Sequence, residues 1–538
     1  MKTIYHNASV YTGTLPLQEA FIVENGKFVF VGKSSDALAK QQDGDLIVDL
    51  NTAFVCPGFN DSHMHLLGYG QTLNNARLEQ HTSSLSDVLQ CLREFSERRT
   101  GRSGWIVGRG WNQDFFTDVH RMPNRYDLDK VSTEIPICAV RACGHALAVN
   151  SRALELIGVT AQTVQPDGGE IGMDDGEPNG LFFDNAMDLV HSAISIPDKE
   201  SVKVMIRSAC RSLNAYGVTS CQSDDYCAFT SLPWQTVNEA FRELEASGEL
   251  TVRVYEQANF MNLPDLKEFV QAGNRTGCGS DRFKIGPLKM LGDGALGPRT
   301  AYLSRPYADA PDTCGIPVFS QETFDEMIGY ANSEGMQVAV HAIGDACLDR
   351  VLSALEKALA IHPRDDHRHG IVHCQITRAD QLKAIGKKNL HIYAQSIFLD
   401  YDIAIVEARA GKELAATSYS WKTAAKHGAT VSNGTDSPVE QPFALGGIQC
   451  CVTRSNLNGT APVYLPQEAF TMQEALDSYT SAGAYASFEE SKKGRIETGM
   501  YADFVVLDRN LFSIAPSTIK DTRVLATYLE GKQIYSAN

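Results

Sequence analysis

The sequence has a deficit of positive charge and no long apolar run. Of its 538 residues, 48 are Lys or Arg and 65 are Asp or Glu, which gives a formal net charge of −17. This balance disfavours nucleic acids and anionic membranes as partners. No stretch reaches the roughly 18 apolar residues of a membrane span, and Met1 to Asn7 lack the apolar segment of a secretory signal. We therefore expect a cytoplasmic protein with a small-molecule substrate, and leave a homodimer open.

Motifs of several enzyme classes are also missing. The sequence has no Gly-x-Ser-x-Gly nucleophile elbow and no glycine-rich phosphate loop, which argues against serine-hydrolase and kinase chemistry. Its 13 cysteines include no Cys-x-x-Cys pair. Free thiols in a reducing compartment fit this odd and scattered set better than disulfides do.

Both ends of the chain are rich in short strands. An Asn-Gly pair at 25–26 between two apolar runs predicts a hairpin, and residues 502–508 and 524–532 predict further strands. Chain termini often lie close together. We therefore predict one small β-sandwich domain built from residues 1–56 and 490–538.

The middle of the chain alternates short apolar strands with helical stretches. We predict eight strands, near residues 53–63, 217–223, 251–259, 283–292, 336–342, 369–374, 390–397 and 429–435. Eight strand–helix units are the number that closes a (β/α)8 TIM-type barrel, although a doubly wound sheet has the same alternation. The predicted fold class is α/β, with the barrel over residues 57–489. The first gap is too long for one helix, so we predict an insertion near 75–195 after the first barrel strand.

Polar residues at the strand ends favour the barrel. The first strand ends in His63 and His65, which point to one side of a strand and can bind one metal. The fifth and sixth strands end in His341 and His373, and the eighth in Asp436. Each residue alone also fits a structural role, such as a turn aspartate. Together they lie where barrel enzymes carry their active sites, and they form a zinc-type set of nitrogen and oxygen ligands.

Lys289 lies inside the apolar fourth strand. A fully buried lysine is rare unless it is paired. A lysine carbamylated by CO2 is an anionic oxygen ligand that can bridge two metals. The alternative is an unmodified lysine at the barrel rim or in a salt bridge with Asp293.

These segments resemble the amidohydrolase superfamily, and specifically its amidohydrolase-3 family, which includes N-substituted formamide deformylase-like enzymes. The similarity runs over nearly the whole chain and includes residues 57–65, 110–113, 141–146, 288–301, 340–345, 372–376 and 494–503. It implies one metal held by His63, His65 and Asp436. It implies a second metal held by His341 and His373, with a carboxylated Lys289 as the bridge. Where relatives commonly read DGS-LGSRTA, residues 293–301 of this chain read DGALGPRTA.

The ligand set predicts one or two divalent metal ions, with zinc expected. A metal lowers the pKa of water to about 7, and Asp436 can take the proton of that water and pass it to a leaving nitrogen. The metal, with His373 or His145, can polarise the substrate carbonyl. His145 lies in a family-like motif but on no predicted barrel strand.

Four further residues are candidates for contact with the substrate. Trp111, Phe115 and Phe116, in the insertion, either cover the pocket or form the core of the insertion. Arg299 either binds an anionic group of the substrate or forms a structural ion pair.

We predict hydrolysis of a non-peptide C–N bond in a linear amide or N-substituted formamide. One alternative is a mononuclear deaminase, but no general-acid glutamate follows His341 closely. The other is a non-catalytic regulatory protein on the same scaffold, which the complete ligand set disfavours.

Overall fold

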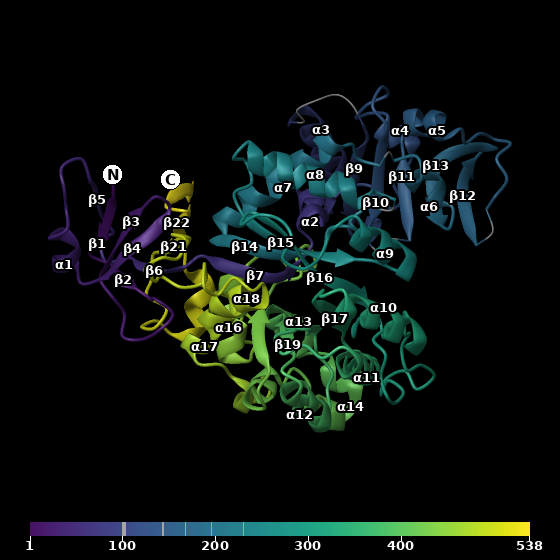
Figure 1. Cartoon of the computed structure of the whole chain (residues 1–538). Helices are drawn as coiled ribbons and strands as arrows, with labels where there is room; N and C mark the ends of the chain where they lie inside the picture. Colours follow the sequence, from purple (N-terminus) through teal and green to yellow (C-terminus); the bar gives the residue numbers. More distant parts are fainter. Residues whose placement is uncertain (99–103, 143–144, 167, 195, 230, 538) are drawn as a thin grey trace. The chain divides into compact units, whose positions relative to one another are not determined.

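The computed structural model describes residues 1–98, 104–142, 145–166, 168–194, 196–229 and 231–537. The chain divides into two compact units. The main unit consists of Met1–Leu67, Ala209–Ala228 and Pro233–Asn538, and the insertion unit consists of Gly68–Ser208 and Phe229–Leu232. Figure 1 shows the chain coloured along its sequence.

Eight parallel strands form the central sheet of the main unit. In sheet order they are β7 (Phe59–Met64), β14 (Val218–Ser223), β15 (Arg253–Asn259), β16 (Phe283–Leu291), β17 (Val338–Ala342), β18 (Gly370–His373), β19 (His391–Ala394) and β20 (Thr430–Asn433). Beyond β20, the backbone N–H of Asp436 donates to His63 O at 2.8 Å, and that of His65 donates to Ser437 O at 2.8 Å. These bonds bring the end of the last strand against the first, and the predicted (β/α)8 barrel is confirmed.

Amphipathic helices follow the barrel strands. The longer ones are α7 (Lys199–Ala215), α8 (Trp234–Ala246), α9 (Leu263–Gln271), α10 (Gln321–Ser333), α11 (Asp345–Ile361), α12 (Ala379–Lys387), α14 (Val406–Ala415) and α16 (Ala444–Thr453). Helix α8 buries Val237, Ala240, Phe241 and Leu244, which recur at the spacing of one helix face. None of the described helices has the length and hydropathy needed to cross a membrane.

The predicted first strand, 53–63, is two strands in the structure. Strand β6 (Phe54–Pro57) belongs to a separate sheet built from both chain ends, which are called the terminal domain below, and β7 begins the barrel at Phe59. Gly58 separates them, and a Cβ atom at this position would lie 2.2 Å from Thr219 Oγ1. The close approach of β14 explains why a residue without a side chain stands at this junction.

Both chain ends build two further sheets that share one core. The first has the order β4 (Lys27–Gly32), β3 (Ala20–Glu24), β1 (Thr3–His6) and β5 (Leu46–Asp49). The second has the order β2 (Ser9–Val10), β6, β21 (Phe504–Leu507), β22 (Val524–Leu529) and β23 (Lys532–Ser536). Buried residues from both sheets, including Tyr5, Phe21, Val55 and Phe504, pack together. The ends marked N and C in Figure 1 lie in this terminal domain.

The insertion unit has its own six-stranded sheet. Its order is β12 (Gly169–Asp174), β13 (Glu177–Asp184), β11 (Ala146–Val149), β10 (Ile137–Arg141), β9 (Ile106–Trp111) and β8 (Ala76–Arg77). The helices α3 (Leu85–Arg98), α4 (Arg125–Leu128), α5 (Ser151–Ile157) and α6 (Met187–His191) belong to the same unit. Trp111 and Phe116 are buried in its core, and Trp111 Nε1 donates to Ala139 O at 2.8 Å. Trp111 therefore has a structural role here, and no exposed surface to offer a substrate.

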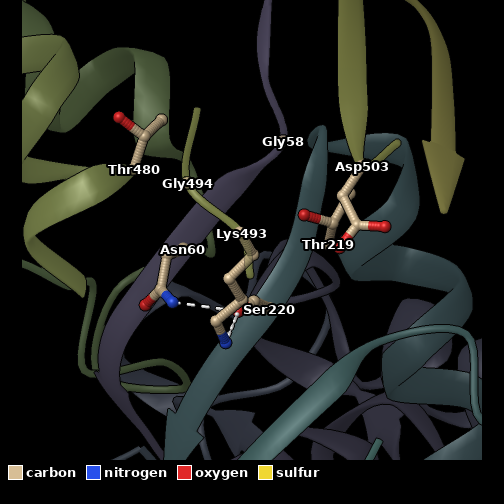
Figure 2. A pocket seen from close by; sticks show the side chains of 8 residues that line it. All are labelled: Gly58, Asn60, Thr219, Ser220, Thr480, Lys493, Gly494 and Asp503. Carbon is tan, nitrogen blue, oxygen red and sulfur yellow. Dashed lines mark hydrogen bonds between the residues drawn. The ribbon is translucent and has the colours of Figure 1, made fainter. Parts of the chain in front are cut away.

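A small cavity lies at the starts of β7 and β14, the end of the barrel opposite to His63 (Figure 2). Its volume is about 10 Å³, the room of roughly one water molecule. Lys493 Nζ and Asn60 Nδ2 both donate to Ser220 Oγ in its wall, at 2.7 and 2.9 Å. The cavity is thus a polar packing site and is far too small for a substrate.

Candidate metal centre

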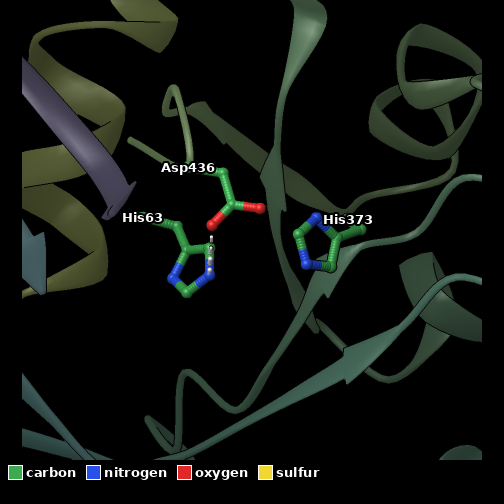
Figure 3. Close-up of side chains that lie close together, drawn as sticks. All are labelled: His63, His373 and Asp436. Carbon is green, nitrogen blue, oxygen red and sulfur yellow. Dashed lines mark ion pairs between the residues drawn. The ribbon is translucent and has the colours of Figure 1, made fainter. Parts of the chain in front are cut away.

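The carboxyl ends of the barrel strands bring the predicted metal ligands together. Asp436 lies between the imidazoles of His63 and His373 (Figure 3), and one donor atom of each of the three lies within 4.8 Å of the others. Asp436 Oδ1 is 3.5 Å from His63 Nε2 and 3.2 Å from His65 Nε2. The ring of His341 lies 4.4 Å from that of His373, measured between centroids. The structure therefore gathers the four histidines and the aspartate that the strand ends predict.

Each of the four imidazoles is oriented by a hydrogen bond through one ring nitrogen. The Nδ1 atoms of His63 and His373 donate to the amide oxygens of Gln257 and Gln395, at 2.8 and 2.7 Å. The remaining ring nitrogens, Nε2 in both residues, are available as ligands. Metal-binding histidines are held in this way by an acceptor on the far side of the ring.

The other two imidazoles use backbone acceptors. His65 Nδ1 donates to Asp224 O at 2.9 Å, and His341 Nε2 donates to Gly294 O at 3.0 Å. His65 therefore offers Nε2 to a metal, whereas His341 offers Nδ1. The hydrogen bonds fix the ligand atom of every ring before any metal binds.

Two buried polar atoms at the centre lack the hydrogen bonds that buried groups normally make. Among the described residues, His63 Nε2 and Asp436 Oδ1 are both buried without a hydrogen-bond partner. Such orphaned atoms are costly and are rare in folded proteins. A divalent cation bound by this nitrogen and this oxygen satisfies both, so the residues present fit a metal.

The protonation states of three ligands suit a metal. At the fourth, His65, burial lowers the pKa, but hydrogen bonds with Asp436 and Cys227 outweigh it and raise the pKa well above its usual range, so a metal would replace the proton on Nε2. Burial, with the charge of Lys289, holds the pKa of His63 well below its usual range, and burial with the charge of His341 does the same for His373. Both rings are therefore neutral, the form that binds metals. Burial raises the pKa of Asp436, but the hydrogen bond of His65 outweighs it and lowers the pKa, which keeps the carboxylate ionised.

The backbone is strained at two of the ligands. His373 has φ 75°, the next residue Cys374 has φ 51°, and Asp436 has φ 57°. Residues other than glycine rarely adopt this left-handed region, at a cost on the order of 1–3 kcal/mol each, and such strain clusters at functional sites. Trp421 Nε1 donates to the carbonyls of His373 and Cys374, at 3.0 and 3.1 Å, and so supports the turn.

Lys289 is buried beside the histidines, but its partner is not the predicted one. Its Nζ donates to Asp224 Oδ2 at 3.1 Å. Asp293 instead accepts the backbone N–H groups of Ile343 and Gly344, at 3.0 and 2.8 Å. The suggested Lys289–Asp293 pair is therefore wrong, because Asp293 is occupied in the loop after β17.

Four residues near these ligands were not predicted from the sequence: Asp224, Cys227, Gln257 and Gln395. All four lie at or just after the carboxyl ends of barrel strands β14, β15 and β19, the same position that identified the histidines. A polar residue at the carboxyl end of a barrel strand was the signal in the sequence that could have identified them. It was not enough alone, because Gln257 and Gln395 act on the histidines through contacts that the sequence does not reveal.

The remaining candidates are described by their own contacts. Arg299 donates through Nε and Nη2 to Asp309, at 3.1 and 2.9 Å, which is the structural ion pair considered above. His145, in the insertion unit, has Nδ1 3.0 Å from Asp184 Oδ1 and a side chain that is 79% exposed. Phe115 is 64% exposed. Roles of these residues in catalysis or substrate binding stay predictions.

Comparison with known proteins agrees with this geometry. The model of the amidohydrolase family matches residues 46–535. The chain belongs to the amidohydrolase family. The putative amidohydrolase YtcJ of Bacillus subtilis is 33% identical over 545 residues, which cover 99% of each chain. The N-substituted formamide deformylase of Arthrobacter pascens is 25% identical, over 95% of this amidohydrolase and 94% of that enzyme.

A solved structure shares the whole architecture. It is an uncharacterized metal-dependent hydrolase from Pyrococcus furiosus, which superposes with a TM-score of 0.78 at 29% identity. The match covers 95% of this amidohydrolase and 100% of that chain. The family, the barrel and the convergent histidines together identify a metal-dependent hydrolase scaffold with a candidate metal site at its mouth.

Proposed function

We propose that this amidohydrolase hydrolyses a non-peptide C–N bond in a linear amide or N-substituted formamide. The observation that carries the proposal is the set of four imidazoles, each held through one nitrogen so that the other is offered to a metal beside Asp436. One or two divalent ions, with zinc expected, supply an activated water when bound. The printed name of the Arthrobacter pascens relative supports the formamide class.

In this proposal the ligands divide as the family resemblance implies. His63, His65 and Asp436 would hold one metal, His341 and His373 would hold a second, and a carboxylated Lys289 would be a ligand of both. The contact of Lys289 with Asp224 is compatible with that modification. A carbamate nitrogen keeps one N–H, which can donate to Asp224 Oδ2 as the ammonium does at 3.1 Å.

Asp436 is the proposed general base. Its carboxylate stays ionised because the hydrogen bond of His65 lowers its pKa. It takes a proton from the water and passes it to the leaving nitrogen. His373 would act on the carbonyl only through the metal it holds, because its Nδ1 donates to Gln395. His145, oriented by Asp184, is proposed to donate a hydrogen bond to the substrate. A soluble small molecule in the cytoplasm is the proposed partner.

The structure favours the hydrolase over a deaminase. A mononuclear deaminase needs a carboxylic acid close to the metal in the loop after His341. The acid in that loop, Asp345, accepts from Ser304 Oγ at 2.5 Å and from Arg378 Nη1 at 2.8 Å. It is therefore engaged in a structural network at the start of α11.

The test is metal analysis together with a substrate panel. Protein purified without chelators should contain one or two equivalents of a divalent transition metal. It should release formate or a carboxylate from N-substituted formamides or linear amides. Chelation should abolish turnover, and added zinc should restore it. Metal-free active protein, or a protein that releases ammonia from cyclic amidines but leaves every amide intact, contradicts the proposal.

A further inference from the structure

A second group of metal-binding atoms adjoins the first. One donor atom from each of His65, Asp224 and Cys227 lies within 4.8 Å of the other two. His65 belongs to both groups, because its Nε2 is also 3.2 Å from Asp436 Oδ1. Nitrogen, carboxylate oxygen and sulfur are the three donor types that zinc takes in proteins.

Asp224 is fixed so that it presents one oxygen to Cys227. The residue is fully buried, and its Oδ2 accepts from Asn259 Nδ2 at 2.9 Å and from Lys289 Nζ at 3.1 Å. Its other oxygen, Oδ1, accepts from Cys227 Sγ at 3.3 Å. The thiol proton thus lies between a sulfur and a carboxylate oxygen, where a bound cation can replace it.

The same residue also orients His65. The backbone oxygen of Asp224 accepts from His65 Nδ1 at 2.9 Å, which turns Nε2 away from the β14 backbone. Asp224 therefore positions both the imidazole and the thiol. Cys227 follows the end of β14 by four residues and is exposed, so the group is open to solvent on the cysteine side.

We propose that Cys227 is a thiolate ligand of the metal bound by His65, with Asp224 Oδ1 beside it. This inference rests on the proposed function, because it requires that the centre binds a metal. On binding, the S–H bond breaks, a sulfur–metal bond forms, and the proton leaves to solvent through the exposed side. A thiolate donor favours zinc over manganese or magnesium, which prefer oxygen ligands.

The test is spectroscopy of the metal-loaded full chain. With zinc bound, X-ray absorption at the zinc edge should require a sulfur scatterer at about 2.3 Å. With cobalt(II) in place of zinc, a sulfur-to-cobalt charge-transfer band should appear in the near ultraviolet. Cys227→Ser should lose the sulfur scatterer and this band, while the visible cobalt bands from the histidine ligands persist.

Cys278→Ser is the matched control, because Cys278 is also an exposed free cysteine but lies before β16, away from the strand ends that carry the ligands. It should keep both signals. Fully metallated wild-type protein with only nitrogen and oxygen scatterers overturns the inference, and leaves the proposed hydrolase standing. X-ray absorption of the wild-type protein needs no variant, so this test stands even if Cys227→Ser does not fold. A wild-type protein that binds no metal overturns both.

Discussion

The two ends of the same barrel differ in how their buried polar groups are satisfied. At the mouth, His63 Nε2 and Asp436 Oδ1 are buried without hydrogen bonds, and two ligands have left-handed backbone. At the opposite end, Arg253 donates to Asp503 at 2.7 Å and to Glu530 at 2.8 Å, all within a paired network. Unsatisfied polar atoms mark the end that fits a metal, and satisfied ones mark the end that stabilises the barrel.

A second network of paired charges lies at the end of the barrel opposite to the mouth, which we call the closed end. Glu489 accepts from Lys284 Nζ at 2.6 Å and lies 2.7 Å from Lys493 Nζ. Lys493 in turn donates to Ser220 in the wall of the small cavity. These lysines are hydrogen-bonded, whereas His63 Nε2 at the mouth is buried without a hydrogen-bond partner. Substitutions at the two ends should therefore separate into effects on activity and effects on stability.

The largest effect is expected at Asp436. Asp436→Asn keeps the size of the side chain but removes the base, so kcat for a hydrolysed amide should fall on the order of 10²–10⁴-fold. Steady-state kinetics at saturating substrate, with metal content measured on the same sample, checks this. Asp36→Asn, on an exposed helix of the terminal domain, is the control and should leave kcat unchanged. Near-normal kcat in Asp436→Asn would assign the base elsewhere.

The next effect tests the closed end. Arg253→Met removes a guanidinium that is 3% exposed and leaves Asp503 and Glu530 without their shared partner. Breaking a buried ion pair in this way costs about 3–5 kcal/mol of unfolding free energy. Thermal or urea unfolding should show the loss, while metal content and kcat of the folded variant stay near wild type. A loss of metal without a loss of stability would contradict the division between the two ends.

A smaller effect concerns pH. Burial raises the pKa of Glu489, but Lys493 and Lys284 outweigh it and lower the pKa to about 2. Its stabilising contribution is therefore full above the unfolded pKa near 4.3 and is lost as the pH falls towards 2. The size is on the order of 2–3 kcal/mol. Glu489→Gln should be less stable than wild type at pH 7, and the difference should narrow below pH 4. A difference that stays constant with pH would reject the assignment.

The smallest expected effect concerns Gln257, which accepts the hydrogen bond of the metal ligand His63. Gln257→Leu removes the oxygen that holds His63 Nδ1, so the metal affinity should fall about 10–100-fold. Competition with a chromogenic chelator measures this. Gln337→Leu is the matched control, because Gln337 is a buried glutamine before β17 at the closed end, where it binds Tyr255 and Arg368. It should lower stability and leave metal affinity unchanged. Equal losses of affinity in both variants would speak against an orienting role.

Much of the fold could be predicted from local pattern. All eight barrel strands lie within the predicted ranges or a few residues of them, because short apolar runs alternate with helices along the chain. The error at 53–63 arose because the apolar β6 is followed directly by Phe59 of β7 without a polar turn segment, and only packing against Thr219 shows that Gly58 divides them. Periodicity marks where a strand is, but not which sheet it joins.

The sequence by itself determined which residues stand at the barrel mouth. Parallel strands present their carboxyl ends at one rim, so His63, His341 and Asp436 had to converge once the strands were placed. Only the tertiary structure decided the partners of these residues. It paired Lys289 with Asp224, buried Trp111 in the insertion core, and set Cys227 beside His65. Such contacts join side chains far apart in the chain, and they depend on strand register and packing, which no local pattern encodes.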